Sequence, residues 1–197
     1  MSTNAIAQQL GTRAASVTDM IQRLASKSLV DYEKYYGVML TKHGRSVAIE
    51  LIRRHRLWET FLVDKLGFQW DQVHDMAEEL EHVASIELIS RLDDFLGNPK
   101  FDPHGDPIPD KDGNIAYHED VKLDSVESGQ EGLIVGVVDH TPDFLKYLDK
   151  NGLIIKAHVK VVQIEEYDNS RTISINRKQS MTVSQKVAAN ILIRRMR

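Results

Sequence analysis

The stretch VHDMAEELEH, which spans residues 73–82, holds six ionisable side chains, and the spacing of four of them could place them together. If this stretch is helical, His74, Glu78, Glu81 and His82 fall within one arc of about 100°, because each residue advances a helix by about 100°. A neighbouring stripe of apolar residues can then face a core. Two imidazoles and two carboxylates on one face are either a solvated polar surface or a set of metal ligands.

A second pair of candidate ligands lies earlier in the chain. His55 and Glu59 are spaced four residues apart in a long predicted helix, close enough to bind one ion together. An isolated pair of this kind is more often an ordinary surface pair. The four donors of residues 73–82 and this second pair together favour a metal site over a solvated face.

The sequence does not indicate an enzyme. A catalytic zinc helix carries H-E-x-x-H or H-x-x-E-H, and neither occurs. The chain also has no P-loop, no nucleophile elbow and no glycine-rich dinucleotide motif. A metal-dependent hydrolase is therefore the least favoured reading.

Composition limits the setting and the ligands. The chain has 197 residues, of which 42% are hydrophobic and 27% are charged, as in ordinary globular proteins of two or three units. It has no cysteine, so any metal site must use nitrogen and oxygen donors. Without disulfides, a secretory signal or an apolar run that could cross a bilayer, we expect a cytoplasmic protein with no membrane partner.

The charge is unevenly distributed along the chain. Residues 1–56 hold nine Lys/Arg against four Asp/Glu, a balance of +5, within a chain whose net charge is −4. A basic front part on an acidic body is typical of a DNA-binding module joined to another function.

The front part also has the element order of a winged helix-turn-helix. Residues 2–11 predict a short helix, residues 12–29 a second helix after a tight turn, and residues 29–41 a hairpin. The start of a recognition helix contacts base edges, and flanking residues hold phosphates. For the groove we predict Arg13, Ser16, Thr18 and Asp19; for the wing we predict Lys34, Tyr35 and Tyr36.

The rest of the chain predicts a helical middle and a β-rich end. Thr41 caps a long helix that ends at Gly67, and Asp71 and Ser85 cap two more, whose apolar surface suggests a dimer interface. Residues 98–114 hold four of the five prolines and predict a loop. Beyond this loop we expect three strands over residues 132–138, 157–165 and 171–175, a short helix over residues 142–150 and a terminal helix over residues 184–195. These elements fit a small SH3-like β-barrel. The predicted fold class is α+β.

Several motifs resemble the diphtheria toxin repressor family, and more closely its manganese transport regulator branch. They are HRLWETFL, VHDMAEELEH, PHGDPIP and the wing YEKYYGVMLTKHG, and the resemblance covers nearly the whole chain. It implies a winged helix-turn-helix DNA-binding domain in residues 1–45 and a helical metal-binding and dimerisation domain with a Pro-rich linker in residues 46–118. Residues 119–197 would form a FeoA/SH3-like domain. Family members begin with a further helix that supplies a metal ligand, and we expect this chain to lack it.

The resemblance also implies two metal sites. One would use Glu78, Glu81 and His82; the other would use His55, Glu59 and His74. Asp139 and His140 fall near the second site and are possible extra ligands from the C-terminal domain. A carboxylate, Glu78, stands where iron-responsive members have a cysteine, which favours Mn²⁺ with Fe²⁺ second, although Zn²⁺ or Co²⁺ can bind more tightly in vitro.

The sequence thus predicts a homodimeric, metal-dependent repressor of metal-uptake genes that binds a double-stranded DNA operator. Two alternatives stay open. A winged-helix regulator not controlled by metal would bind DNA equally well after chelation. A metal-binding accessory protein without DNA function would bind metal but no specific DNA site.

Overall fold

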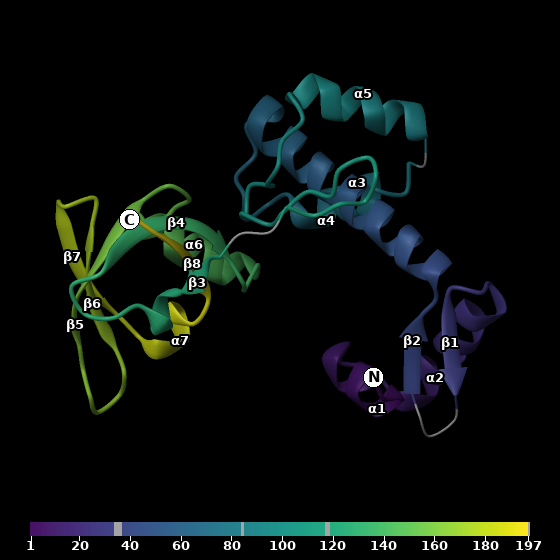
Figure 1. Cartoon of the computed structure of the whole chain (residues 1–197), viewed down its shortest axis with the longest axis horizontal. Helices are drawn as coiled ribbons and strands as arrows, with labels where there is room; N and C mark the ends of the chain where they lie inside the picture. The colour runs from purple at the N-terminus through teal and green to yellow at the C-terminus, as the bar shows by residue number, and fades with distance from the viewer. Residues whose placement is uncertain (34–36, 84, 117–118, 197) are drawn as a thin grey trace. The chain divides into compact units, whose positions relative to one another are not determined.

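The computed structural model describes residues 1–33, 37–83, 85–116 and 119–196 (Figure 1). It divides into two compact units, Met1–Arg53 and Arg54–Arg197, each with its own buried apolar residues. Within the described residues, no helix combines the length and the apolar character that a membrane span requires.

The first unit has the predicted helix–helix–hairpin order. Its elements are α1 (Thr3–Gln9), α2 (Ala14–Ser26), β1 (Val30–Glu33) and β2 (Gly37–Leu40). Val17 and Ile21, one helical turn apart on α2, are buried against Ala7 of α1 and Val30 of β1. The strands are antiparallel, with Val30 opposite Leu40. The winged helix-turn-helix prediction is confirmed.

The long helix α3 (Lys42–Leu66) supplies the residues on which the site is built. Thr41 caps it as predicted, since its Oγ1 accepts a hydrogen bond from the Gly44 backbone N–H at 2.9 Å. The helix ends before Gly67, whose φ of +73° suits a residue without a Cβ. Leu57 and Leu62 on α3 are buried, so that stretch of the helix has a fixed rotation about its axis.

Two shorter helices follow, α4 (His74–Leu80) and α5 (Ile86–Leu96). Ser85 caps α5 as predicted, but the predicted cap of α4 is wrong. The residue before α4 is Val73, which makes no side-chain cap, and the Asp71 carboxylate instead lies 3.8 Å from Lys146 Nζ. The helix α4 ends at Leu80, but Glu81 keeps helical backbone angles and its N–H donates to the Ala77 carbonyl oxygen at 2.8 Å, whereas His82 lies beyond the helix.

The C-terminal part of the second unit is one six-stranded antiparallel sheet with the order β3-β8-β4-β5-β6-β7. Its elements are β3 (Val121–Lys122), the 3₁₀ turn η1 (Leu123–Ser125), β4 (Glu131–Val137), α6 (Pro142–Lys150), β5 (His158–Ile164), β6 (Arg171–Ile175), β7 (Gln179–Val183), α7 (Gln185–Ala188) and β8 (Ile191–Arg195). The three predicted strands and the helix after the first of them are confirmed, and with them the α+β class.

The predicted terminal helix is wrong over its second half. Only Gln185–Ala188 is helical, and Ile191–Arg195 forms β8 beside β4. Ile191 and Ile193 are fully buried while their neighbours are half-buried or exposed. That alternation has the period of a strand with one face on a core.

The proline-rich loop, residues 98–114, is anchored against the sheet. The Val137 backbone N–H on β4 donates to the His104 carbonyl oxygen at 3.0 Å. Gly105 adopts a φ of +88°, and a Cβ built there would lie only 2.0 Å from the Val135 carbonyl oxygen. Glycine at this position therefore allows the loop to approach β4 closely enough to place its neighbours beside α3.

Candidate metal centre

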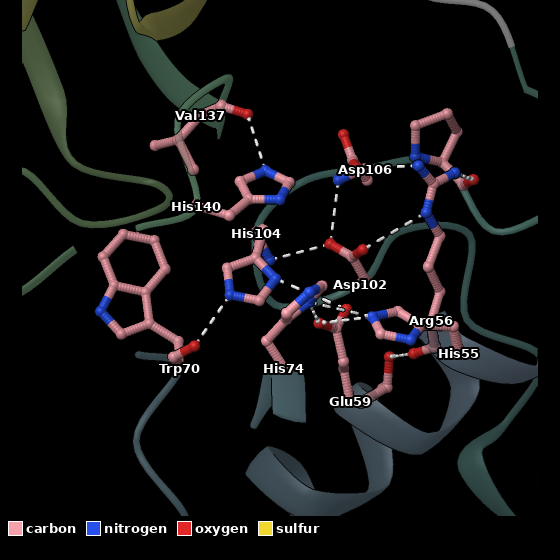
Figure 2. Close-up of polar contacts among 12 residues, drawn as sticks. His55, Arg56, Glu59, Trp70, His74, Asp102, His104, Asp106, Val137 and His140 are labelled. Atoms are coloured by element: carbon pink, nitrogen blue, oxygen red, sulfur yellow. Dashed lines mark hydrogen bonds and ion pairs between the residues drawn. The ribbon is translucent and has the colours of Figure 1, made fainter. Parts of the chain in front are cut away.

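Three predicted ligands lie together where α3 faces the start of α4. His55 Nε2 lies 3.1 Å from Glu59 Oε1 and 3.2 Å from His74 Nδ1 (Figure 2). His74 Nδ1 is also 3.5 Å from Glu59 Oε1. Their ligand atoms all lie within 4.8 Å of one another, close enough to bind one ion. We refer to these three residues as the His55 group.

A second group of candidate ligands shares Glu59, and the sequence analysis did not predict it. Glu59, Asp102 and His104 are all buried, and their ligand atoms also lie within 4.8 Å of one another. We refer to these three residues as the buried group. His104 belongs to the motif PHGDPIP, and Asp102 directly precedes that motif. Their two-residue spacing lies in a loop, so it carries no helical or strand periodicity. The only signal in the sequence was that a histidine and a carboxylate stand beside prolines and a glycine.

Glu59 connects the two groups through its two oxygens. Oε1 faces His55 and His74, and Oε2 lies 3.5 Å from His104 Nδ1. Its side chain is only 3% exposed. Burial alone would raise the pKa of this carboxyl, but the hydrogen bonds and positive charge of His104 and His55 outweigh it and hold the pKa well below its usual range. Glu59 is therefore a buried carboxylate rather than a carboxylic acid.

His104 presents one ring nitrogen to the buried group. Its Nε2 donates to the Trp70 carbonyl oxygen at 2.8 Å, so in the neutral ring Nδ1 carries the lone pair. Nδ1 is buried and has no well-aligned hydrogen-bond partner in the described part of the chain. The ring stacks on Trp70, with the ring centroids 6.0 Å apart, and on His140, with the ring centroids 4.8 Å apart. A buried nitrogen held in this way fits a metal ion opposite it.

One carboxylate oxygen of Asp102 accepts hydrogen bonds from the loop backbone, and the other faces Arg56. Oδ1 accepts the backbone N–H groups of His104, at 2.8 Å, and Asp106, at 2.9 Å. Oδ2 lies 3.6 Å from Arg56 Nε. Burial, followed by the negative charges of Glu59 and Asp106, raises the pKa of Asp102 to about 7. The Arg56 guanidinium, beside Asp102 and Asp106, supplies one positive charge to these three carboxylates, and a metal ion would supply more.

The other predicted site is not assembled in the structure. Glu78 and His82 are exposed, and in the ranges that the structure describes Glu78, Glu81 and His82 form no third group of ligand atoms. Glu81 lies at the end of α4 and turns toward α3, where its Oε2 is 2.8 Å from His55 Nδ1. A carboxylate there fixes which nitrogen of His55 carries hydrogen and leaves Nε2 for an ion. The ligand roles of Glu78, Glu81 and His82 stay predictions.

Neighbouring groups also shift the pKa values of His55 and His140. Burial lowers the pKa of His55, but Glu59 and Glu81 outweigh it and the pKa is raised. The pKa of His140 is lowered by burial and by the nearby His104. His140 Nε2 donates to the Val137 carbonyl oxygen at 3.3 Å, and Asp139 accepts the Thr141 N–H at 2.9 Å. Neither Asp139 nor His140 belongs to a ligand group found in the described residues.

The predicted groove residues lie at the start of α2. Arg13 immediately precedes the helix, and Arg13, Ser16 and Asp19 are exposed. Thr18 is half-buried and donates its hydroxyl to the Ala14 carbonyl oxygen at 2.9 Å. Their contact with DNA stays a prediction. The wing residues Lys34, Tyr35 and Tyr36 lie outside the residues that the structure describes.

The helices around the site also expose apolar side chains. On α5, Ile86 is 77% exposed and Phe95 is 63% exposed, and Leu88 is exposed as well. Exposed side chains of this size along one helix are typical of a surface that is covered in an assembly.

Comparison with known proteins extends over nearly the whole chain. Three domain families match: the iron dependent repressor N-terminal DNA binding domain over residues 1–38, the iron dependent repressor metal binding and dimerisation domain over residues 41–110, and the FeoA domain over residues 121–195. The first match covers α1, α2, β1 and the first two residues of β2, the second covers α3, α4 and α5, and the third covers the antiparallel sheet.

Individual relatives agree with the domain matches. The iron-dependent repressor IdeR of Mycobacterium leprae is 32% identical over 168 residues, which is 79% of this chain and 73% of the relative. The HTH-type transcriptional regulator MntR of Oceanobacillus iheyensis is 37% identical over 99 residues, 50% of this chain and 67% of the relative. A solved structure described as a manganese-dependent transcriptional repressor in complex with manganese has a TM-score of 0.88 and 35% identity, covering 99% of this chain and 91% of the other. The chain belongs to this family of iron- and manganese-dependent transcriptional repressors.

Proposed function

We propose that this chain is a manganese-responsive repressor that binds a double-stranded DNA operator as a homodimer. The observation that carries the proposal is the Glu59 carboxylate. It is buried and ionised, and it is held between the His55 group on one side and the buried group on the other. Beside this buried charge lies a buried imidazole nitrogen, His104 Nδ1, that has no hydrogen-bond partner among the described residues, and a cation would complete such a site.

The donor set favours Mn²⁺, with Fe²⁺ second. The chain has no cysteine, and the two groups offer only imidazole nitrogens and carboxylate oxygens. Carboxylate oxygens suit manganese and imidazole nitrogens suit iron, whereas Zn²⁺ or Co²⁺ can bind more tightly in vitro without being the ion to which the protein responds. The similarity to a manganese-dependent repressor described in complex with manganese supports this choice.

The ligands come from three separate elements. His55 and Glu59 lie on α3, His74 on α4, and Asp102 and His104 in the proline-rich loop. A bound divalent ion supplies the positive charge that these donors share. The residues themselves hold the helices and the loop at a fixed separation, and Glu81 orients His55 through its Nδ1.

DNA and dimer contacts follow from the other two surfaces. We propose that Arg13, Ser16, Thr18 and Asp19 at the start of α2 enter the major groove, and that a second copy covers the exposed side chains of α5. A homodimer presents two such helices to the two halves of a palindromic operator. The regulated genes would be those of metal uptake.

Selection of bound fragments from a genomic DNA library tests the proposal, run once with Mn²⁺ and once with a chelator. The expected result is a palindromic site enriched only with Mn²⁺. The Glu59→Gln variant should lose this enrichment, whereas Glu166→Gln, a matched change at an exposed position, should keep it.

The other outcomes identify the alternatives. Equal enrichment with Mn²⁺ and with chelator would indicate a winged-helix regulator that does not respond to metal. Binding of Mn²⁺ without enrichment of any DNA site would indicate a metal-binding accessory protein. Either result would refute the proposal.

A further inference from the structure

Arg56 extends from α3 to the proline-rich loop beside the buried group. It follows His55 in the chain, and its side chain is 20% exposed. One terminal nitrogen donates to the Pro107 carbonyl oxygen at 2.5 Å, and the other donates to Asp106 Oδ2 at 2.8 Å. Its Nε lies 3.6 Å from Asp102 Oδ2 (Figure 2). The planar guanidinium therefore contacts three residues of one loop at once.

The loop backbone connects the contacts of Arg56 to Asp102, which is a proposed metal ligand. The Asp106 N–H donates to Asp102 Oδ1, and the His104 N–H donates to the same oxygen. The rotamer of Asp102 is thus fixed by the loop, and the far arm of the loop is fixed by Arg56. Neither contact requires a metal ion to be present.

We infer that Arg56 is a positioning residue for the buried group, holding the loop so that the Asp102 carboxylate lies beside Glu59 and His104 before a metal ion binds. The inference rests on the proposed metal function and adds a residue that is not itself a ligand. It explains why Asp106, which is no member of either ligand group, carries a carboxylate directed at α3.

Arg56 also has an effect of the opposite sign. Its positive charge near Asp102 Oδ2 repels a divalent ion that would bind the same oxygen. If repulsion dominated, removing Arg56 would tighten metal binding; if positioning dominates, removal weakens it. Both well-formed hydrogen bonds of the guanidinium go to Asp106 and Pro107, and its contact with Asp102 is the longest of the three. The geometry therefore favours positioning.

The test is a Co²⁺ titration of the full chain, followed by the visible absorption of the bound ion. The part of the absorption change that the His104→Ala variant loses is assigned to Co²⁺ bound at the buried group. For that change, Arg56→Gln should lower the affinity about tenfold to a hundredfold, the usual cost of removing a residue that orients a ligand. Arg56→Lys keeps the charge without the planar fork and should recover part of the loss. Arg91→Gln removes an exposed arginine on α5 and should change nothing.

A second variant separates positioning from a general loss of structure. Asp106→Ala removes the side-chain acceptor of Arg56 while leaving the arginine in place. If Arg56 acts through Asp106, the double variant should bind Co²⁺ no more weakly than Arg56→Gln alone. Fully additive losses would overturn the inference, as would unchanged or tighter binding by Arg56→Gln.

Failure of the inference is distinguishable from failure of the proposed function. If His104→Ala removes an absorption change that Arg56→Gln leaves intact, the buried group binds metal and only the role of Arg56 is wrong. If His104→Ala removes nothing, the metal site itself is refuted and the inference falls with it.

Discussion

Metal binding by the buried group should strengthen as the pH rises from 6 to 8. The pKa of Asp102 is raised to about 7, so below that pH the metal-free protein carries a proton on this carboxyl. A metal ion requires the carboxylate and must displace that proton. The pKa of His104 is raised as well, by Glu59 and Asp102 acting against its burial, so a second proton competes in the same range.

The expected size follows from the Asp102 pKa alone. At pH 6, one unit below it, about ten molecules are protonated for each one that is not, and apparent affinity falls about tenfold, or about 1.4 kcal/mol. At pH 8 about one molecule in ten is protonated, and the penalty nearly disappears. Protonation of His104 adds to this factor and leaves its sign unchanged.

Isothermal titration calorimetry with Mn²⁺ measures this directly, at pH 6, 7 and 8 and in buffers of different ionisation enthalpy. The dependence of the heat on the buffer gives the number of protons released, which we expect to be at least about one per ion at pH 6. In Asp102→Asn the contribution of this proton should be absent. An affinity that stays constant from pH 6 to pH 8, with no proton released at pH 6, would refute the reasoning.

Three further predictions concern the shared carboxylate, the loop and the DNA surface. Glu59→Gln should lower the bound Mn²⁺ at both ligand groups, whereas His74→Ala should affect one and His104→Ala the other, as counted by elemental analysis after dialysis. Gly105→Ala should lower the free energy of unfolding by at least about 1–2 kcal/mol in a urea titration, because of its positive φ and the added clash with a β4 carbonyl oxygen; an unchanged midpoint would contradict the close approach. Arg13→Gln should reduce the slope of log affinity against log salt by about one unit if the arginine contacts a phosphate, and an unchanged slope would remove it from the interface.

Periodicity predicted the elements that bury one face. The helical spacing of Val17 and Ile21 and the capping by Thr41 and Ser85 gave the helices correctly, since each signal lies within a few residues of the element it describes. The strand β8 was mistaken for helix because only two residues separate it from the four helical residues of α7, and because its alternation is only five residues long.

The candidate site was half predictable for a similar reason. His55, Glu59 and His74 were found because their spacing along helices is itself a signal. Asp102 and His104 have no such spacing. They reach Glu59 because a loop packs closely on β4 and is held by hydrogen bonds from distant parts of the chain, an arrangement that no local pattern records.

Because Trp70 stacks on His104, its intrinsic fluorescence can report on the buried group. The indole lies 6.0 Å from an imidazole of the buried group, and the chain has just two tryptophans. Paramagnetic ions such as Mn²⁺ or Co²⁺ quench the emission of an adjacent indole. In a Trp58→Phe background the remaining fluorescence would report the arrival and departure of the ion in real time, without any attached dye.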